Sequence, residues 1–130
     1  MNIFSNKKIL IYGLGKSGLS AFNFLKDKSN VFLYDDSQSK IKTFEVKKRL
    51  INYKTVIKKK FDQIIISPGI DINKCKLSIF LKKNYNKIFS DLDVFYTFFK
   101  NVCITITGTN GKSTTSQLMY EVLLNEKFYV

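Results

Sequence analysis

The sequence predicts an α/β protein whose N-terminal part is a Rossmann-like parallel sheet. Short β-rich runs alternate with helical stretches along most of the chain, which is typical of βαβ units. Each of the first three runs is followed at once by glycine, proline or aspartate, so the chain is expected to turn at the carboxyl ends of its strands. Ligands bind at that edge in open parallel sheets. The sequence therefore predicts a site where these turns meet.

The individual elements follow from apolar and β-branched runs in chain order. The first strand is an apolar run that ends at Gly13, and the next two strands end at the turns Asp35-Asp36-Ser37 and Ser67-Pro68-Gly69. A helical stretch follows each of these turns, and a short strand then leads into a helix rich in aromatic residues. The expected strands are Lys8–Tyr12, Val31–Tyr34, Gln63–Ser67 and Lys87–Phe89; the expected helices are Ser17–Lys26, Lys40–Leu50, Leu77–Lys83 and Asp91–Phe99.

A second domain is expected to begin near Asn101, which gives domains at 1–100 and 101–130. The β-branched run Val102–Thr107 predicts a strand, and Lys112–Asn125 predicts a helix, with a glycine-rich loop between them. These are the first strand, loop and helix of a P-loop ATPase-type central domain. Because a lone strand and helix cannot bury both faces of a parallel strand, this domain is expected to be incomplete as given.

Composition excludes several classes of function. The chain has 22 Lys and Arg against 10 Asp and Glu, but Arg49 is its only arginine, and readout of phosphates and bases relies on the planar fork of Arg. We therefore expect no nucleic-acid partner. Cys75 and Cys103 stand apart in a sequence without His, which argues against a zinc site and favours a reduced, cytoplasmic location. No apolar stretch approaches the ~20 residues of a membrane span, so no membrane partner is expected.

The segment Gly13-Leu14-Gly15-Lys16-Ser17-Gly18 matches G-x-G-x-x-G between an expected strand and helix, and Asp35 ends the next strand. Glycine permits a tight turn and close backbone approach, and a helix N-terminus offers free N–H groups to a diphosphate. Asp35 is placed to accept a hydrogen bond from a ribose or a base. The motif predicts a diphosphate ligand without identifying the nucleotide. The alternative is that these glycines only pack the helix against the strand.

A second glycine-rich loop, Gly108-Thr109-Asn110-Gly111-Lys112-Ser113-Thr114, opens the helix of the second domain. The backbone amides of such a loop cradle the phosphates of ATP, Lys112 would neutralise the β/γ charge, and the Ser113 hydroxyl would bind Mg²⁺. The common pattern has glycine where Ile106 stands here, and in this chain Gly108 lies closer to the lysine. ATP and Mg²⁺ are therefore the expected cofactors, and a hydroxyl-rich helix cap is the alternative.

This shortened loop, T-G-T-N-G-K-S-T, resembles that of the Mur ligases, the ATP-dependent amide-forming enzymes of peptidoglycan precursor synthesis. Three further segments resemble, in order, the D-glutamate-adding members of the family, so that the resemblance covers essentially the whole chain: GLGKSGLS at Gly13–Ser20, SPGI at Ser67–Ile70 and SDLDVF at Ser90–Phe95. In the last segment Ser90 stands for a glycine of the family and Asp93 for a glutamate. We assign Asp93 no ligand role.

The resemblance implies that the first domain binds the UDP part of UDP-N-acetylmuramoyl-L-alanine instead of NAD. The amides around Gly15, Lys16 and Ser17 would face the diphosphate, and Asp35 and Asp36 would lie by the uridine. The turn Ser67-Pro68-Gly69 would close the same crevice, although a rigid surface turn without ligand contact is an equal alternative.

The resemblance also implies a reaction. The γ-phosphoryl group of ATP passes to the substrate carboxylate, and the amine of D-glutamate attacks the resulting acyl phosphate. Lys112 is the implied catalytic residue, which stabilises charge on the transferring group. The amino-acid-binding part of the family is not among the residues given, so this polypeptide alone is expected to be inactive, and the full-length form is expected to be a monomer.

Two other functions stay open. An NAD-binding regulatory or dehydrogenase domain accounts for Gly13–Gly18 and Asp35 but leaves Thr107–Thr114 unexplained. A P-loop kinase or ATPase accounts for that loop but leaves the ordered N-terminal motifs unexplained.

Overall fold

A computed structural model of the chain describes residues 3–37, 44–99 and 101–128. The chain divides into two compact units, Met1–Lys100 and Asn101–Val130. Within the described ranges, no helix is both long and apolar enough to cross a membrane.

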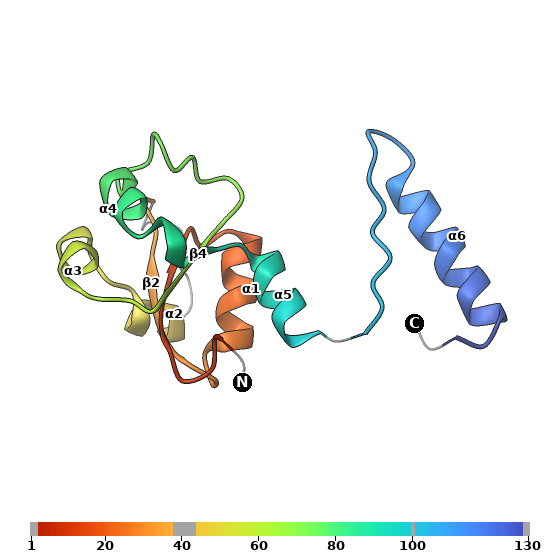
Figure 1. The fold of residues 1–130 in the computed structure, drawn as a ribbon, viewed down its shortest axis with the longest axis horizontal. Coiled ribbons are helices and arrows are strands. Elements are labelled where there is room, and N and C mark those ends of the chain that lie inside the picture. The colour runs from red at the N-terminus through yellow and green to blue at the C-terminus, as the bar shows by residue number, and fades with distance from the viewer. Residues whose placement is uncertain (1–2, 38–43, 100, 129–130) are drawn as a thin grey trace. The chain divides into compact units, whose positions relative to one another are not determined.

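The first unit is built on a four-stranded, fully parallel sheet with the strand order β2-β1-β3-β4 (Figure 1). In that register Ile11 of the central strand β1 lies opposite Leu33 on one side and Ile65 on the other. The strands are β1 (Lys8–Tyr12), β2 (Asn30–Tyr34), β3 (Gln63–Ile66) and β4 (Ile88–Phe89). This confirms the predicted α/β, Rossmann-like class.

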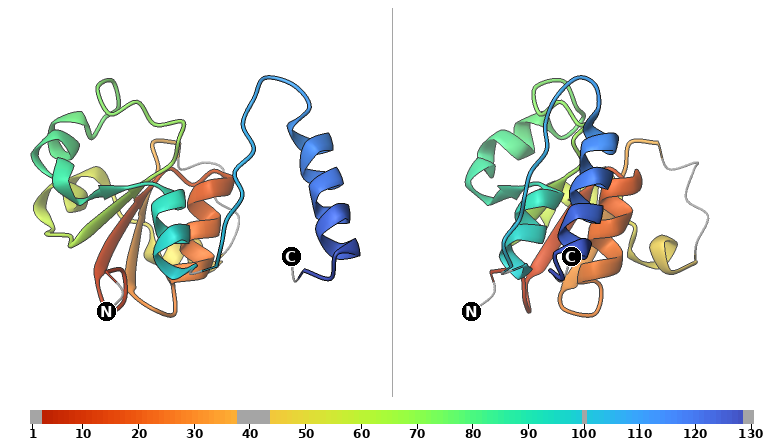
Figure 2. Two further views of the ribbon diagram at one scale, coloured as in Figure 1. Left: turned by 45° about the vertical axis from the view of Figure 1, so that its right-hand side comes forward. Right: turned by 90° about the vertical axis from the view of Figure 1, so that its right-hand side faces the viewer.

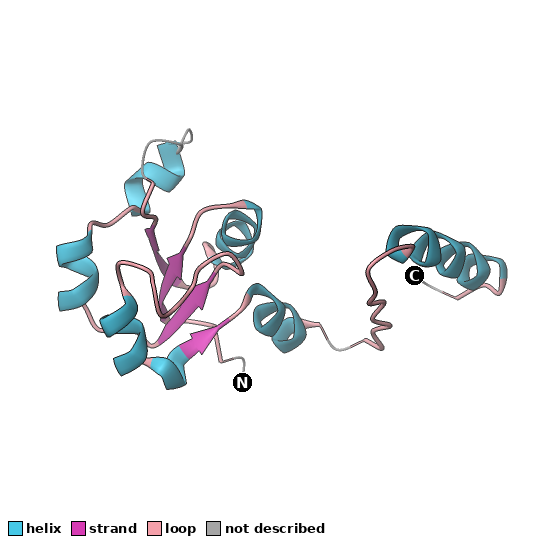
Figure 3. Ribbon diagram, turned by 90° about the horizontal axis from the view of Figure 1, so that it is seen from above, coloured by secondary structure: helices cyan, strands magenta, loops and turns pink. Residues whose placement is uncertain are grey.

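Helices cover both faces of the sheet, as the view from above shows (Figure 3). On one face α1 (Lys16–Leu25), α2 (Phe44–Arg49) and α5 (Asp91–Phe98) pack against Ile9 and Ile11, and on the other α3 (Tyr53–Lys58) and α4 (Ser78–Lys83) pack against Leu10 and Tyr12. Successive residues of β1 therefore enter two different cores. Burial on both faces explains why the strands are almost continuously apolar instead of alternating.

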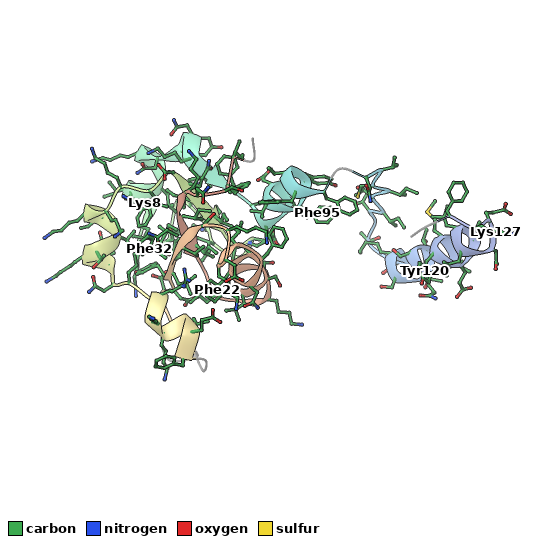
Figure 4. The ribbon with its side chains drawn as sticks, turned by 90° about the horizontal axis from the view of Figure 1, so that it is seen from below. Lys8, Phe22, Phe32, Phe95, Tyr120 and Lys127 are labelled. Carbon is green, nitrogen blue, oxygen red and sulfur yellow. The ribbon has the colours of Figure 1, made fainter. Side chains whose placement is uncertain are left out.

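Aromatic side chains fill much of the space between sheet and helices. Phe22 lies in the core of the α1 face, whereas Phe32 packs against the core of the opposite face (Figure 4). Phe4, fully buried near the start of the chain, contacts Phe89 at 5.2 Å and Phe98 at 6.5 Å between ring centroids. The first and last elements of the unit are thus joined through one ring.

Most helices lie within one or two residues of the predicted bounds. Residues 40–43 of the predicted helix at Lys40–Leu50 lie outside the described residues, and its described part is α2. Helix α3 was not predicted. It begins after Asn52, whose side-chain oxygen accepts a hydrogen bond from the Thr55 N–H at 2.9 Å. An Asn followed by apolar residues at helical spacing is the signal that could have predicted it.

In the second unit, α6 (Lys112–Asn125) confirms the predicted helix, but the prediction of a strand at Val102–Thr107 is wrong. That segment is an irregular extended stretch before α6 (Figure 2). A strand is defined by its ladder of hydrogen bonds, and within the described residues no other segment pairs with this one. Its β-branched residues favour extended backbone, which is not sufficient to form a strand alone.

Candidate functional site

The turn from β1 into α1 is shaped by the neighbours of Gly13. This residue has φ +91°, a value that strains any residue with a side chain. Its N–H donates to the Tyr34 carbonyl oxygen at 3.0 Å, and a Cβ added to it would lie 2.8 Å from Ser67 Oγ. The first glycine of the motif is therefore required by the strands on both sides of β1.

The other two glycines of the motif differ in whether a side chain would fit at their position. A Cβ on Gly18 would lie 1.8 Å from the Gly13 carbonyl oxygen, so Gly18 lets α1 pack directly on the end of β1. A Cβ on Gly15 would meet nothing within 4 Å, and its φ of −72° is open to any residue. Packing thus accounts for Gly13 and Gly18 but not for Gly15, which borders free space.

The N-terminus of α1 begins beside that space. Gly15 is the N-cap, no side chain caps the helix, and the Leu19 N–H donates to the Gly15 carbonyl oxygen at 3.0 Å. The N–H groups of the preceding first turn have no partner within the helix. With no acidic residue in that turn, the helix end favours an anion.

The turn after β3 forms the opposite wall. The Ile70 N–H closes it by donating to the Ser67 carbonyl oxygen at 3.0 Å, and the Ser67 N–H donates to the Tyr12 carbonyl oxygen at 3.0 Å. The Ser67 hydroxyl donates to the Gly13 carbonyl oxygen at 2.8 Å. Both walls of the crevice are therefore tied to each other and to the end of β1.

Between these walls lies a cavity of about 440 Å³, within the size range of small-molecule sites. It contains all the predicted UDP-binding residues except Asp36, together with Leu14 and Ile70, which sequence reasoning did not single out. Its lining is Gly13, Leu14, Gly15, Lys16, Ser17, Asp35, Ser67, Pro68, Gly69 and Ile70. A larger cavity of about 560 Å³ lies between α1 and α5, but its lining is mostly aliphatic and aromatic and offers little to a charged ligand.

The two neighbouring carboxylates after β2 have different surroundings. Asp35 lines the cavity and accepts hydrogen bonds from the Leu14 N–H and the Ser37 N–H, both at 2.7 Å. Asp36 instead accepts hydrogen bonds from the hydroxyls of Tyr12 at 2.6 Å and Tyr34 at 3.1 Å. The structure therefore separates two residues that the family resemblance places together beside the uridine.

Burial and the nearby Asp36 carboxylate keep both tyrosines protonated. Burial is the larger cause and the hydrogen bond to Asp36 the next, and together they raise the pKa of Tyr34 to about 12 and that of Tyr12 further. Both hydroxyls are consequently donors at neutral pH.

The second glycine-rich loop, described by itself, has a left-handed turn at the start of α6. Gly111 is the N-cap with φ +74°, and Gly108 has φ +149°. The Lys112 ammonium reaches back over the loop to donate to the carbonyl oxygens of Gly108 and Thr109. The ammonium and the unpaired first-turn amides of α6 thus lie at one end of the helix, where the sequence predicts phosphate binding.

Lys112, Ser113 and Thr114 are exposed at the start of α6, and Thr109 and Asn110 are exposed in the loop before it. Across 3–37, 44–99 and 101–128, no group of three or more His, Cys, Asp or Glu side chains is arranged to hold a metal. Of the residues predicted here, Ser113 alone is a metal-ligand candidate.

Comparison with known proteins identifies the family. Residues 7–88 match the family described as Mur ligase MurD-like, N-terminal domain. The chain is 38% identical over 130 residues to the UDP-N-acetylmuramoylalanine--D-glutamate ligase of Rickettsia prowazekii (strain Madrid E), covering 95% of this chain and 28% of that protein. It is 36% identical over 123 residues to the ligase of the same name from Aquifex aeolicus (strain VF5), covering 94% of this chain and 26% of that one.

The chain thus spans little more than a quarter of the length of these relatives. Among solved structures, a UDP-D-quinovosamine 4-dehydrogenase from Vibrio fischeri aligns with 77% of this chain and 96% of its own at 24% identity, with a TM-score of 0.46, too distant a likeness to carry an argument. The match over 7–88 and the relatives just described agree with the glycine motif, the crevice beside it and the parallel sheet. The chain belongs to the family of Mur ligase MurD-like N-terminal domains.

Proposed function

We propose that this chain supplies the UDP-binding crevice and the ATP-phosphate loop of a ligase that adds D-glutamate to UDP-N-acetylmuramoyl-L-alanine. The observation that carries the proposal is the space beside Gly15, at an uncapped helix N-terminus, which packing does not explain. The relatives' names state the D-glutamate ligase activity of those proteins, and its extension to this chain is part of the proposal.

In the first unit, different residues of the crevice would bind different parts of the nucleotide. The amides at the start of α1, around Gly15, Lys16 and Ser17, would hold the diphosphate, and the Lys16 ammonium would add positive charge. Asp35 would accept a hydrogen bond from the nucleoside part. The turn Ser67-Pro68-Gly69 would bound the pocket on its far side.

In the second unit, the loop Gly108–Thr114 would hold the phosphates of ATP. The residues fit this ligand because glycine occupies both positions of positive φ and because the helix N-terminus has no side-chain cap. On binding, the Lys112 ammonium would exchange the carbonyl oxygens of Gly108 and Thr109 for phosphate oxygens. The Ser113 hydroxyl would serve as the protein ligand of the Mg²⁺ that accompanies ATP and offsets the phosphate charge.

Activation of a carboxylate as an acyl phosphate leaves the protein the tasks of positioning and charge stabilisation. Lys112 would stabilise negative charge on the transferring phosphoryl group, and the fixed amide dipoles of the loop would do the same without reorganising.

The first test is a calorimetric titration of the chain with UDP-N-acetylmuramoyl-L-alanine, and in parallel with NADH. We expect saturable binding of the UDP compound that free UDP competes and NADH does not. Binding of NADH with no response to the UDP compound would instead make the first unit a dinucleotide-binding module and overturn the proposal.

A second test concerns the loop. Lys112→Gln should abolish measurable ATP binding, whereas Lys127→Gln, which removes a lysine charge in the same unit, should leave it within about twofold. Equal ATP affinity in both variants would remove Lys112 from the proposed role.

A third test concerns catalysis. With ATP, D-glutamate and the UDP compound all present, the chain alone should release no phosphate. Release that depends on both other substrates would show that these 130 residues suffice for catalysis.

A further inference from the structure

Two buried tyrosines converge on the carboxylate of Asp36. Tyr12 ends β1 and Tyr34 ends β2, and the parallel register places them side by side, with ring centroids 5.2 Å apart. Tyr12 is fully buried and Tyr34 is 3% exposed. Their hydroxyls reach the edge of the sheet, where Asp36 Oδ2 accepts from Tyr12 and Oδ1 accepts from Tyr34.

This arrangement engages each carboxylate oxygen in one hydrogen bond, a short one from Tyr12 and a longer one of 3.1 Å from Tyr34. The bond from Tyr12 is 2.6 Å long, the length typical of a hydroxyl donating to an ionised carboxylate. Burial and the hydrogen bond to Asp36 raise the pKa values of both tyrosines above 10.0, so both hydroxyls are donors at neutral pH. Asp36 is thus held at two points by side chains that are themselves fixed in a packed core.

The preceding residue faces the nucleotide crevice. Asp35 bonds the Leu14 N–H of the glycine loop with one oxygen and the Ser37 N–H with the other. Asp35 and Asp36 directly follow β2 and are joined by one planar peptide bond, so a shift of the Asp36 backbone also moves Asp35. Fixing Asp36 on the tyrosine side therefore fixes Asp35 on the crevice side.

We propose that Asp36 is a positioning residue, clamped by Tyr12 and Tyr34, and that of the two carboxylates only Asp35 contacts the nucleotide. This inference rests on the proposed UDP-binding function of the crevice. It differs from the expectation that both carboxylates lie against the uridine, and it assigns to the tyrosines an indirect role in nucleotide affinity.

The test is a double-mutant cycle on UDP affinity, measured by calorimetry on the whole chain. Asp36→Ala and the pair Tyr12→Phe/Tyr34→Phe should each weaken UDP binding about tenfold, the lower end of effects known for residues that orient a ligand-binding group. Combining all three changes should weaken binding by no more than about a further twofold, because the same clamp is lost each time. Asp36→Asn keeps one acceptor oxygen, so its UDP affinity should stay within about threefold of that of the unsubstituted chain.

Direct contact between Asp36 and the ligand predicts a different pattern. The tyrosine pair would then leave UDP affinity within about twofold, while Asp36→Ala alone would weaken it, and the proposal would be overturned. Tyr85→Phe, which alters a tyrosine that is 70% exposed, is the matched control for removal of a hydroxyl. Circular dichroism at the temperature of titration identifies any variant that is not folded, and the milder Tyr34→Phe then stands in for the pair.

A second readout separates this inference from the proposed function. If the clamp positions Asp35, amide hydrogen exchange at the Leu14 N–H should quicken about tenfold in the tyrosine pair and remain unchanged in Tyr85→Phe. Should the unsubstituted chain fail to bind UDP, the proposed function falls. The positioning of Asp35 is then decided by this exchange rate, and an unchanged rate overturns the inference as well.

Discussion

The two glycine loops of this chain both place glycines just before a helix, but they differ in strand pairing and burial. Gly13–Gly18 lies between a paired strand and a packed helix, and its turn is tied to β2 and β3 by backbone and hydroxyl hydrogen bonds. Gly108–Thr114 follows a stretch that pairs with no strand in the described residues. It runs into α6, in which no described residue is buried. Yet both loops adopt positive φ at glycine and both start a helix with an uncapped N-terminus.

The comparison separates local from non-local determinants of a phosphate-binding turn. Glycine conformation and helix start depend on residues a few positions apart, so both loops have them. A strand forms only when it pairs with a segment distant in sequence. In the described residues, β1 before the first loop has such partners and the stretch before the second loop does not. The differences in burial predict where substitutions will change stability.

The largest expected difference in the free energy of unfolding comes from truncating one leucine in each unit. Leu10 is fully buried in β1, whereas Leu118 of α6 is 59% exposed. Leu10→Ala should lower the free energy of unfolding by about 2–5 kcal/mol, and Leu118→Ala by less than about 0.5 kcal/mol. Urea denaturation followed by circular dichroism measures both, and similar losses would show that α6 contributes to the same cooperative core.

The next largest effect concerns two glycines of one motif. Gly18→Ala places a Cβ against the Gly13 carbonyl oxygen and should cost about 1–3 kcal/mol, since a backbone atom must move. Gly15→Ala meets no atom within 4 Å and should change stability by less than about 1 kcal/mol while weakening UDP binding. If Gly15→Ala destabilised the fold as much as Gly18→Ala, the space beside Gly15 would not be free for a ligand.

A pH dependence should distinguish the two units. The pKa of Tyr34 is about 12 in the folded chain and ordinarily 10.0, so the folded state holds this proton more tightly. The associated stability is fully present below pH 10.0 and is lost as pH rises toward 12. The gap in unfolding free energy between the chain and Tyr34→Phe should therefore narrow over this range.

Comparing the variant with the parent chain cancels the contribution of every titrating group that the two chains share. A constant gap in unfolding free energy for Tyr34→Phe would contradict the effect of burial and of the Asp36 hydrogen bond on this hydroxyl.

The smallest effect expected is the loss of a helix cap. The Ser90 hydroxyl accepts a hydrogen bond from the Asp93 N–H, and the Asp93 carboxylate accepts one from the Ser90 N–H, so the pair forms a capping box at α5. Ser90→Ala should cost about 1 kcal/mol. Ser116→Ala, which removes a hydroxyl that bonds the Lys112 carbonyl oxygen inside α6, should cost nothing measurable. Thermal unfolding compares the two, and an equal shift in Tm would remove the special role of Ser90.

The capping box also illustrates what the sequence could predict. Ser90 and Asp93, which stand where the family has a glycine and a glutamate, form a matched local pair, and the Asp93 carboxylate is engaged in the cap. The glycine motif, the first three strands and most helices follow from equally local patterns. The parallel sheet confirms the fold class, and the comparisons confirm the family.

The features that the sequence did not predict depend on contacts between residues far apart in the chain, which a local sequence pattern does not show. Nothing near Asp36 in the sequence indicates that Tyr12, 24 positions earlier, donates to it, because that contact is created by the parallel register of β1 and β2. The strand predicted at Val102–Thr107 failed for the converse reason, since propensity is local and pairing is not. The roles of the predicted binding residues stay predictions until ligand is titrated.

The ring of Phe4 has a consequence for the order in which the first unit matures during synthesis. Phe4 emerges first but is buried against Phe89 and Phe98, near the end of that unit. Domains fold largely as units while the chain is made, and contacts between distant residues form late. Until α5 has left the exit tunnel the Phe4 ring lacks its contact with Phe98, and a polypeptide released before Phe98 would expose more of that ring to solvent.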